Sequence, residues 1–142
     1  DIYIQRFDDQ GYSEPEKLPE AINSSAIEYC PEISLDGNLL FFCRMGLGKE
    51  DGIYLSKKVD GDWSVAIRLS EIVNRGYAER FPKYDEANKI LYFNRQVFKY
   101  EGSSVESLTM ERIQNIVISK PQNGSGDIYF IEYEGLTDEG VD

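Results

Sequence analysis

Short apolar runs and stretches of alternating polarity mark the strands of this chain. Residues 39–42 and 90–93 are wholly apolar, which is typical of short strands that are covered on both faces. Residues 53–57 have the composition of another strand, which ends at the turn residues 60–62. Residues 63–69 alternate between large apolar and small or polar side chains, as a half-buried strand does. The pattern therefore predicts an all-β fold of short strands.

These elements recur along the chain at a spacing of 51 residues. Residues 1–43 align without a gap on residues 52–94, and conservative replacements lie between the identical positions. Four short strands in about 51 residues are typical of one blade of a β-propeller, so the 142 residues correspond to about 2.8 such units. The identical pairs are Ile2/Ile53, Tyr3/Tyr54, Asp9/Asp60, Ser13/Ser64, Leu18/Leu69, Glu20/Glu71, Asn23/Asn74, Glu28/Glu79, Pro31/Pro82, Leu40/Leu91 and Phe42/Phe93.

A third, compressed copy follows the second. Residues 115–119 and 126–130 repeat the pattern of residues 38–42 and 51–55, but about half a blade is missing before them. The stretch from 95 to 114 has two interpretations. Residues 97–100 could form a strand, and the capping-box pattern Ser103-Ser104-Val105-Glu106 could instead begin a short helix that reaches about Ile113.

The repeat divides the chain into incomplete four-stranded antiparallel blades. We expect one partial propeller over residues 1–136, followed by an acidic tail. The predicted parts are the outer strands of a first blade (1–28), a second blade (29–70), a partial third blade (79–105), a partial fourth blade (106–136) and the tail (137–142).

Two cysteines flank a predicted hairpin. If Asp36-Gly37 is a two-residue turn, Cys30 and Cys43 face each other within reach of a disulfide. If the loop has three residues with Gly37 in a bulge, the two cysteines are out of register and remain small buried side chains. Two cysteines cannot form a four-ligand zinc site.

Several of these segments together resemble the WD-like propeller repeat of the TolB type, in which an Asp-Gly turn, an apolar strand and a closing Asp-Ile-Tyr follow one another. The resemblance covers most of residues 1–94 and 115–131. It departs at Leu35, where the family favours proline, at residues 85–87, where the Asp-Gly turn is lost, and across 95–114. The segments that carry it are 12–15 with Leu18, 22–23 with Glu28 and Pro31, 33–38 with 40–42, Trp63-Ser64 with Leu69, and 127–129.

The resemblance implies a fold, a location and a range of functions. Repeats of this type build six-bladed propellers in exported bacterial proteins of the cell envelope, often as interaction modules. They also form lids on serine peptidases and occur in a few polysaccharide-degrading enzymes. A fold of this kind does not determine the function by itself.

Composition excludes several classes of function. The formal net charge is −11, which argues against binding nucleic acid or anionic lipid. No apolar run approaches the roughly 20 residues of a membrane span. The chain has no histidine, so every His-containing catalytic triad is excluded.

Glu28 and Glu79 are the strongest candidates for chemistry. A pair of carboxylates could act as acid and base in a glycosidase or lyase. Both residues lie at the same repeat position, however, and catalytic groups seldom recur in every repeat. We therefore expect each carboxylate to bind a loop backbone in its own blade.

Four other motifs are weaker candidates. Residues 122–127 have the composition of a cation-binding loop but lack the alternating carboxylates of a calcium site. Residues 46–48 and Gly52 lack the Gly-Lys-Ser/Thr sequence of a phosphate loop. The serines at 103, 104 and 125 lie in no Gly-x-Ser-x-Gly elbow. Tyr12 and Trp63 share one repeat position and either pack between blades or form a stacking platform for sugars or peptides.

The sequence thus predicts a binding or protein-interaction module with no catalytic, cofactor or metal residues. We expect a fragment of a longer exported protein, in the periplasm or cell envelope, whose partner is a protein or a small-molecule or glycan ligand. We expect no nucleic-acid partner and no membrane insertion. The alternative is the propeller part of an enzyme, either a carbohydrate-active propeller or a peptidase lid whose catalytic domain is outside this chain.

Overall fold

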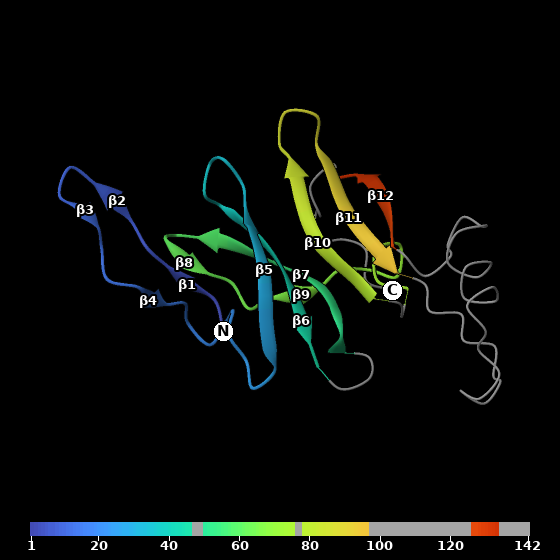
Figure 1. The fold of residues 1–142 in the computed structure, drawn as a ribbon, viewed down its shortest axis with the longest axis horizontal. Helices are drawn as coiled ribbons and strands as arrows, with labels where there is room; N and C mark the ends of the chain where they lie inside the picture. Colours follow the sequence, from blue (N-terminus) through green and yellow to red (C-terminus); the bar gives the residue numbers. More distant parts are fainter. Residues whose placement is uncertain (47–49, 76–77, 97–125, 134–142) are drawn as a thin grey trace, which may run out of the picture.

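A computed structural model describes residues 1–46, 50–75, 78–96 and 126–133 of the chain (Figure 1). The two interpretations of residues 95–114 fall almost wholly outside these ranges, as do the predicted strand at 115–119 and the acidic tail. The described residues hold strands and turns but no α-helix. The strands are β1 (Tyr3–Ile4), β2 (Phe7–Asp8), β3 (Gly11–Tyr12), β4 (Glu16–Lys17), β5 (Ile27–Ile33), β6 (Leu39–Met45), β7 (Gly52–Val59), β8 (Asp62–Trp63), β9 (Ile67–Arg68), β10 (Ala78–Asp85), β11 (Ile90–Gln96) and β12 (Asp127–Glu132).

The strands form separate antiparallel sheets, and none of the described sheets closes into a barrel. The middle sheet has the order β5-β6-β7-β8, and β9 also pairs with β7. Since β8 and β9 pair with the same strand, they together take the place of a fourth strand. The last sheet has the order β10-β11-β12. At the other end, β1 pairs with β4 and β2 pairs with β3. These sheets confirm the predicted all-β fold of incomplete, blade-like antiparallel sheets.

The repeat seen in the sequence is a repeat of strand pairing. Tyr54 pairs with Arg68 between β7 and β9, and Tyr3 pairs with Lys17 between β1 and β4. The first 18 residues therefore contain the counterparts of the third and fourth strands of the middle sheet. Figure 1 shows these strands and the last sheet at opposite ends of the described part of the molecule, with the middle sheet between them.

The position of β12 differs from the predicted division of residues 79–105 and 106–136 into two blades. β12 pairs directly with β11, in the register that β7 has on β6: Phe93 faces Tyr129 as Phe42 faces Tyr54. The described parts of the two ranges consequently belong to one sheet. Residues 97–125 separate the second and third strands of this sheet along the chain, whereas β6 and β7 follow each other closely.

A bulge at the same place in β5 and β10 breaks the register of each hairpin. Cys30 and Phe81 have φ angles of 51° and 55°, and each precedes a proline. Proline has no N–H to donate, so a bulge accommodates it inside a strand. Pro31 and Pro82 thus lie within their strands.

The bulge in β5 also determines which residue lies opposite Cys43. Ile33 pairs with Leu40, as a two-residue turn at Asp36-Gly37 predicts, but beyond the bulge Cys43 pairs with Tyr29. Cys30 therefore lies beside the direct cross-strand partner of Cys43. Both thiols are free.

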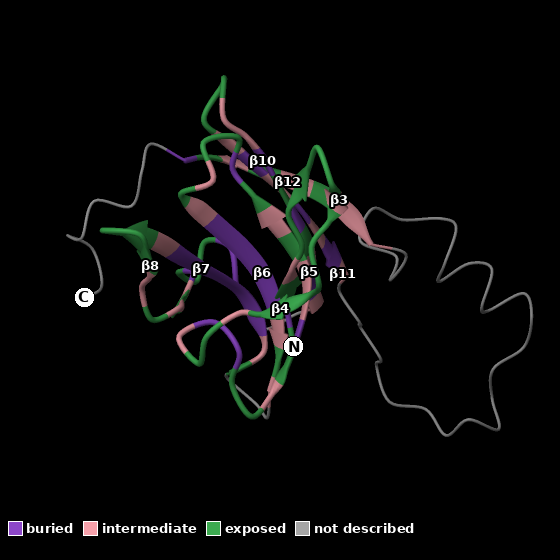
Figure 2. Cartoon of the chain, turned by 90° about the vertical axis from the view of Figure 1, so that its left-hand side faces the viewer, coloured by how far each residue is buried: buried purple, intermediate pink, exposed green. Residues whose placement is uncertain are grey.

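Two apolar clusters lie between successive sheets. One joins Phe41 and Ile53 of the middle sheet to Leu91 and Phe93 of the last sheet. The other joins Phe42 of the middle sheet, with Leu40 and Tyr54, to Ile2 and Ile22 of the N-terminal part. β6 and β7 are accordingly buried on both faces, as the wholly apolar run 39–42 predicts for β6, and Figure 2 shows burial concentrated in these strands.

Candidate functional site

The candidate carboxylate Glu79 lies in a buried ion pair. Its Oε1 accepts hydrogen bonds from Arg95 Nε at 2.9 Å and from the backbone N–H of Arg75 at 3.2 Å. Nη2 of Arg95 reaches back into the preceding loop and donates to the carbonyl oxygen of Val73 at 2.7 Å. The guanidinium carbon lies 4.5 Å from the centre of the Tyr129 ring. One arginine therefore links a carboxylate, a loop and the next strand.

Glu28 makes the same arrangement one repeat earlier. Its Oε1 accepts hydrogen bonds from Arg44 Nε at 2.9 Å and from the backbone N–H of Ser24 at 3.0 Å. Arg44 Nη2 donates to the carbonyl oxygen of Ile22 at 2.9 Å, and its guanidinium carbon lies 4.3 Å from the Tyr54 ring centre. The carboxylate, guanidinium and loop-backbone contacts each have a counterpart 51 residues later, and Tyr129 takes the place of Tyr54, so the Glu–Arg pair belongs to the repeat.

The electrostatics of Glu28 favour its ionised form. Burial raises the pKa of this carboxyl group, but the hydrogen bonds from the Ser24 side chain and backbone and the Arg44 guanidinium outweigh burial, so that the pKa is lowered overall. The second oxygen, Oε2, is buried and accepts no hydrogen bond from the residues that the structure describes. A general acid requires the opposite, a carboxyl group held protonated near neutral pH. Each of the two carboxylates binds the backbone of a loop in its own repeat, as the sequence predicts.

Asn23 and Asn74 make a second set of repeated contacts, which together with the Glu–Arg pairs we call the framework. Asn74 Oδ1 accepts the N–H of Ile53 at 2.8 Å, and its Nδ2 donates to the carbonyl oxygens of Ile53 and Leu69 at 2.9 and 2.8 Å. Asn23 makes the corresponding three bonds to Ile2 and Leu18. One amide thereby connects the start of a third strand with the end of the fourth.

Ser13 and Ser64 complete the framework. Their hydroxyl oxygens accept the backbone N–H of Arg6 and of Lys57, each at 3.0 Å. Ser64 does so where the fourth strand is interrupted between β8 and β9. This interruption breaks the alternation expected over 63–69, because Val65 lies exposed while Leu69 is buried.

The other candidates divide into a described and an undescribed group. The serines at 103, 104 and 125 and most of the loops at 122–127 and 46–48 lie outside the described residues. Gly52 is described and has a φ of 144°, and a Cβ there would lie 2.6 Å from Asn74 Oδ1. This glycine therefore permits the close approach of the asparagine, which is a structural role. In the described ranges no group of three or more His, Cys, Asp or Glu side chains could hold a metal ion.

Tyr12 and Trp63 have different environments despite their shared repeat position. Trp63 is half-buried and packs against the cluster of Phe42 and Ile2. Tyr12 is 75% exposed and pairs with Phe7, which is 73% exposed, at a ring-centre distance of 5.0 Å. Tyr3, on the preceding strand β1, is 55% exposed. Trp63 thus packs between sheets, while Tyr12 belongs to an exposed aromatic surface.

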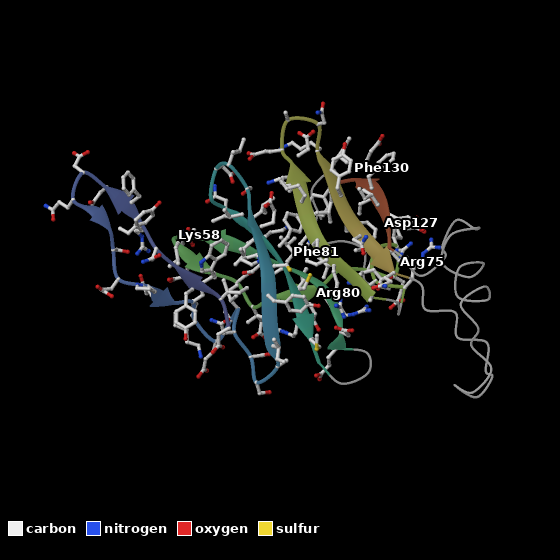
Figure 3. All side chains as sticks on the ribbon, viewed as in Figure 1. Lys58, Arg75, Arg80, Phe81, Asp127 and Phe130 are labelled. Atoms are coloured by element: carbon white, nitrogen blue, oxygen red, sulfur yellow. The ribbon has the colours of Figure 1, made fainter. Side chains whose placement is uncertain are left out.

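A second apolar surface lies on β12. Ile128 and Phe130 are 80% and 64% exposed, and the Phe130 ring lies 6.0 Å from that of its cross-strand partner Tyr92. Figure 3 labels Phe130 on β12, the edge strand of the last sheet. Exposed aromatic side chains of this kind are suited to contact with another macromolecule.

A scan against protein-family models finds no match, and searches of curated proteins and of solved structures find none either. The resemblance to TolB-type repeats consequently rests on the residues that carry it. No helix within the described ranges is long and apolar enough to span a membrane.

Two arginines of the framework were not predicted to have a role. Arg44 and Arg95 obey the 51-residue spacing but lie one position beyond the last aligned pair, Cys43 and Asn94. They could have been found from the sequence, because in both predicted hairpins the same arginine lies on the strand opposite the same glutamate.

Proposed function

We propose that this chain is a non-catalytic protein-interaction module built from TolB-type propeller repeats and belonging to an exported bacterial protein of the periplasm or cell envelope. The observation that carries this proposal is the exposed aromatic surface of Tyr3, Phe7 and Tyr12. The candidate catalytic carboxylates Glu28 and Glu79 support it as well, because both are bound by arginines in a repeated structural arrangement.

The chemistry of the surface favours a protein partner. Tyrosine and phenylalanine provide large contact areas with little conformational entropy to lose, and aromatic residues are enriched at the centres of protein interfaces. The formal net charge of −11 disfavours partners that carry many phosphates. Glycan stacking on Tyr12 is the alternative use of the same surface.

An affinity experiment tests the proposal. The chain is immobilised and exposed to periplasmic extract of the bacterium that encodes it, beside the variants Phe7→Ser/Tyr12→Ser and Val65→Ser. Val65 is as exposed as Tyr12 but lies in the β8–β9 connection, so it controls for a general loss of apolar surface. We expect protein from the extract to be retained by the native chain and by Val65→Ser, and to be lost from the double variant. Equal recovery on all three would contradict the proposal.

A further inference from the structure

Every sheet of this repeat has two faces, and both faces of the middle sheet pack against a neighbouring part of the chain. We call the face of the middle sheet that carries Phe41, Cys43, Ile53 and Leu55 its front face. These four side chains are fully buried because they pack against Leu91 and Phe93 and their neighbours in the last sheet.

The opposite face of the middle sheet, with Leu40, Phe42 and Tyr54, is its back face. It packs against Ile2 and Ile22 of the N-terminal strands. The same contact therefore occurs twice within the chain, and in each case the front face of one unit covers the back face of the next.

The last sheet has a front face that no described residue buries in this way. Its pairs Tyr92–Phe130 and Asn94–Ile128 have the register of Phe41–Leu55 and Cys43–Ile53 in the middle sheet. In the middle sheet these positions are fully buried, whereas Ile128 and Phe130 are largely exposed. The surface on which a next sheet of the repeat would pack thus carries apolar side chains that are exposed to solvent.

The N-terminal strands present the complementary back face. Tyr3 corresponds to Tyr54 and Tyr12 to Trp63, both of which belong to the back face of the middle sheet. Phe7 corresponds to Lys58: Phe7 pairs with Tyr12 as Lys58 pairs with Trp63. The aromatic groups of this back face are exposed, and the strands β2 and β3, which carry Phe7 and Tyr12, lie at the end of the described part of the molecule opposite to β12 (Figure 1).

We infer that the occupant of these two faces is a second copy of this chain, joined head to tail. The front face of β11–β12 in one copy covers the back face of the N-terminal strands in the next. It extends the part of the repeated contact that the third and fourth strands make, because β1–β4 contain no counterpart of β6 with its Leu40 and Phe42. The inference rests on the proposed interaction function and names its partner. Because the two faces differ, the contact is heterologous, and it produces either a closed ring or a growing chain.

Charge repulsion opposes this contact and makes association between copies depend on the salt concentration. Each copy carries a formal charge of −11, so two copies repel each other at low ionic strength. Salt screens that repulsion, while the apolar contact itself does not weaken. Association should therefore increase with added salt.

Complementary variants in sedimentation velocity test the inference. The front variant is Ile128→Asp/Phe130→Asp, the back variant is Phe7→Asp/Tyr12→Asp, and Val65→Asp is the control. Circular dichroism and the urea midpoint of each variant confirm that it folds. We expect the native chain and the control to associate increasingly with protein concentration and with salt, and each double variant to sediment as a monomer.

The mixture of the two double variants gives the decisive result. The front variant retains an intact back face and the back variant an intact front face, so an equimolar mixture should form a heterodimer of twice the monomer mass and grow no further. A native chain that stays monomeric at all concentrations, a double variant that still self-associates, or a mixture that remains monomeric would each overturn the inference. If the native chain is monomeric while the extract experiment still depends on Phe7 and Tyr12, the proposed function stands and the second copy is not the partner.

Discussion

Arg95 Nε lies 2.9 Å from Glu79 Oε1, and the two side chains are only 7% and 1% exposed. Another Arg–Glu pair of the same length, Arg6 with Glu16, is 65% exposed on both sides. Equal distances thus join one pair that has lost its hydration and one that retains it. The energetic consequences of breaking them should differ strongly.

Replacing Arg95 should destabilise the protein far more than replacing Arg6. Arg95→Leu leaves the Glu79 carboxylate buried without its charged partner, which costs about 3–5 kcal/mol of the free energy of unfolding. Arg6→Leu removes an exposed ion pair and should cost at most about 1 kcal/mol. Urea unfolding of both variants measures the two values. The double variant Glu79→Leu/Arg95→Leu should recover part of the loss; a similar cost for Arg95→Leu and Arg6→Leu would show that the buried pair does not stabilise the sheet.

Asn74 should be as sensitive as the ion pair although it carries no charge. Asn74→Ala removes three buried hydrogen bonds and leaves the N–H of Ile53 without its side-chain acceptor. A buried polar group without a partner costs about 1–3 kcal/mol. Asn23→Ala should show a comparable loss, because it makes the same bonds one repeat earlier. Asn88→Ala in the exposed β10–β11 turn is the control, and a loss as large there would mean that burial of the amide is not the cause.

The sequence predicts the individual strands of this fold better than it predicts which distant strands pair with each other. The strands at 39–42 and 90–93 are correct because a wholly apolar run has few alternatives inside an antiparallel repeat. The placement of β12 was not predictable, because pairing across 97–125 depends on tertiary contacts and no spacing rule connects it to β11. The αL conformation of Cys30 and Phe81 was likewise hidden, since residues before proline seldom adopt it.

The candidate site shows the same division. The repetition of Glu28 and Glu79 correctly indicated a structural carboxylate, because a group present in each blade serves each blade. Its partner is an arginine on the neighbouring strand, however, and the backbone N–H groups of Ser24 and Arg75 supply only part of the binding. The exposed aromatic surfaces could not be found from the repeat alone, since the equivalent of Tyr12 is the packed Trp63.

The two thiols should differ in reactivity. Burial is the main cause that raises the pKa of Cys43, to about 12, and it also raises the pKa of the half-buried Cys30. The thiolate is the nucleophile in alkylation, so iodoacetamide should modify folded Cys43 much more slowly than Cys30, and both slowly compared with an unfolded chain. Mass spectrometry of peptides after timed quenching measures the rates. Fewer than two alkylated cysteines in unfolded, unreduced protein would instead reveal a disulfide.

Acid should destabilise the protein through Glu28. Burial raises the pKa of this group, but the hydrogen bonds from Ser24 and the Arg44 guanidinium lower it further than burial raises it, so the folded pKa lies below the unfolded value of 4.5. The folded state therefore binds fewer protons, and the contribution of Glu28 is complete above 4.5 and is lost as the pH falls through the folded pKa. Ser24→Ala weakens the lowering, so it should reduce stability at neutral pH and flatten the acid limb. The free energy of unfolding in urea, measured from neutral pH to below 4.5, gives both effects, and the exposed neighbour Ser25→Ala is the matched control. An acid limb of unchanged slope in Ser24→Ala would mean that Ser24 does not set the pKa of Glu28.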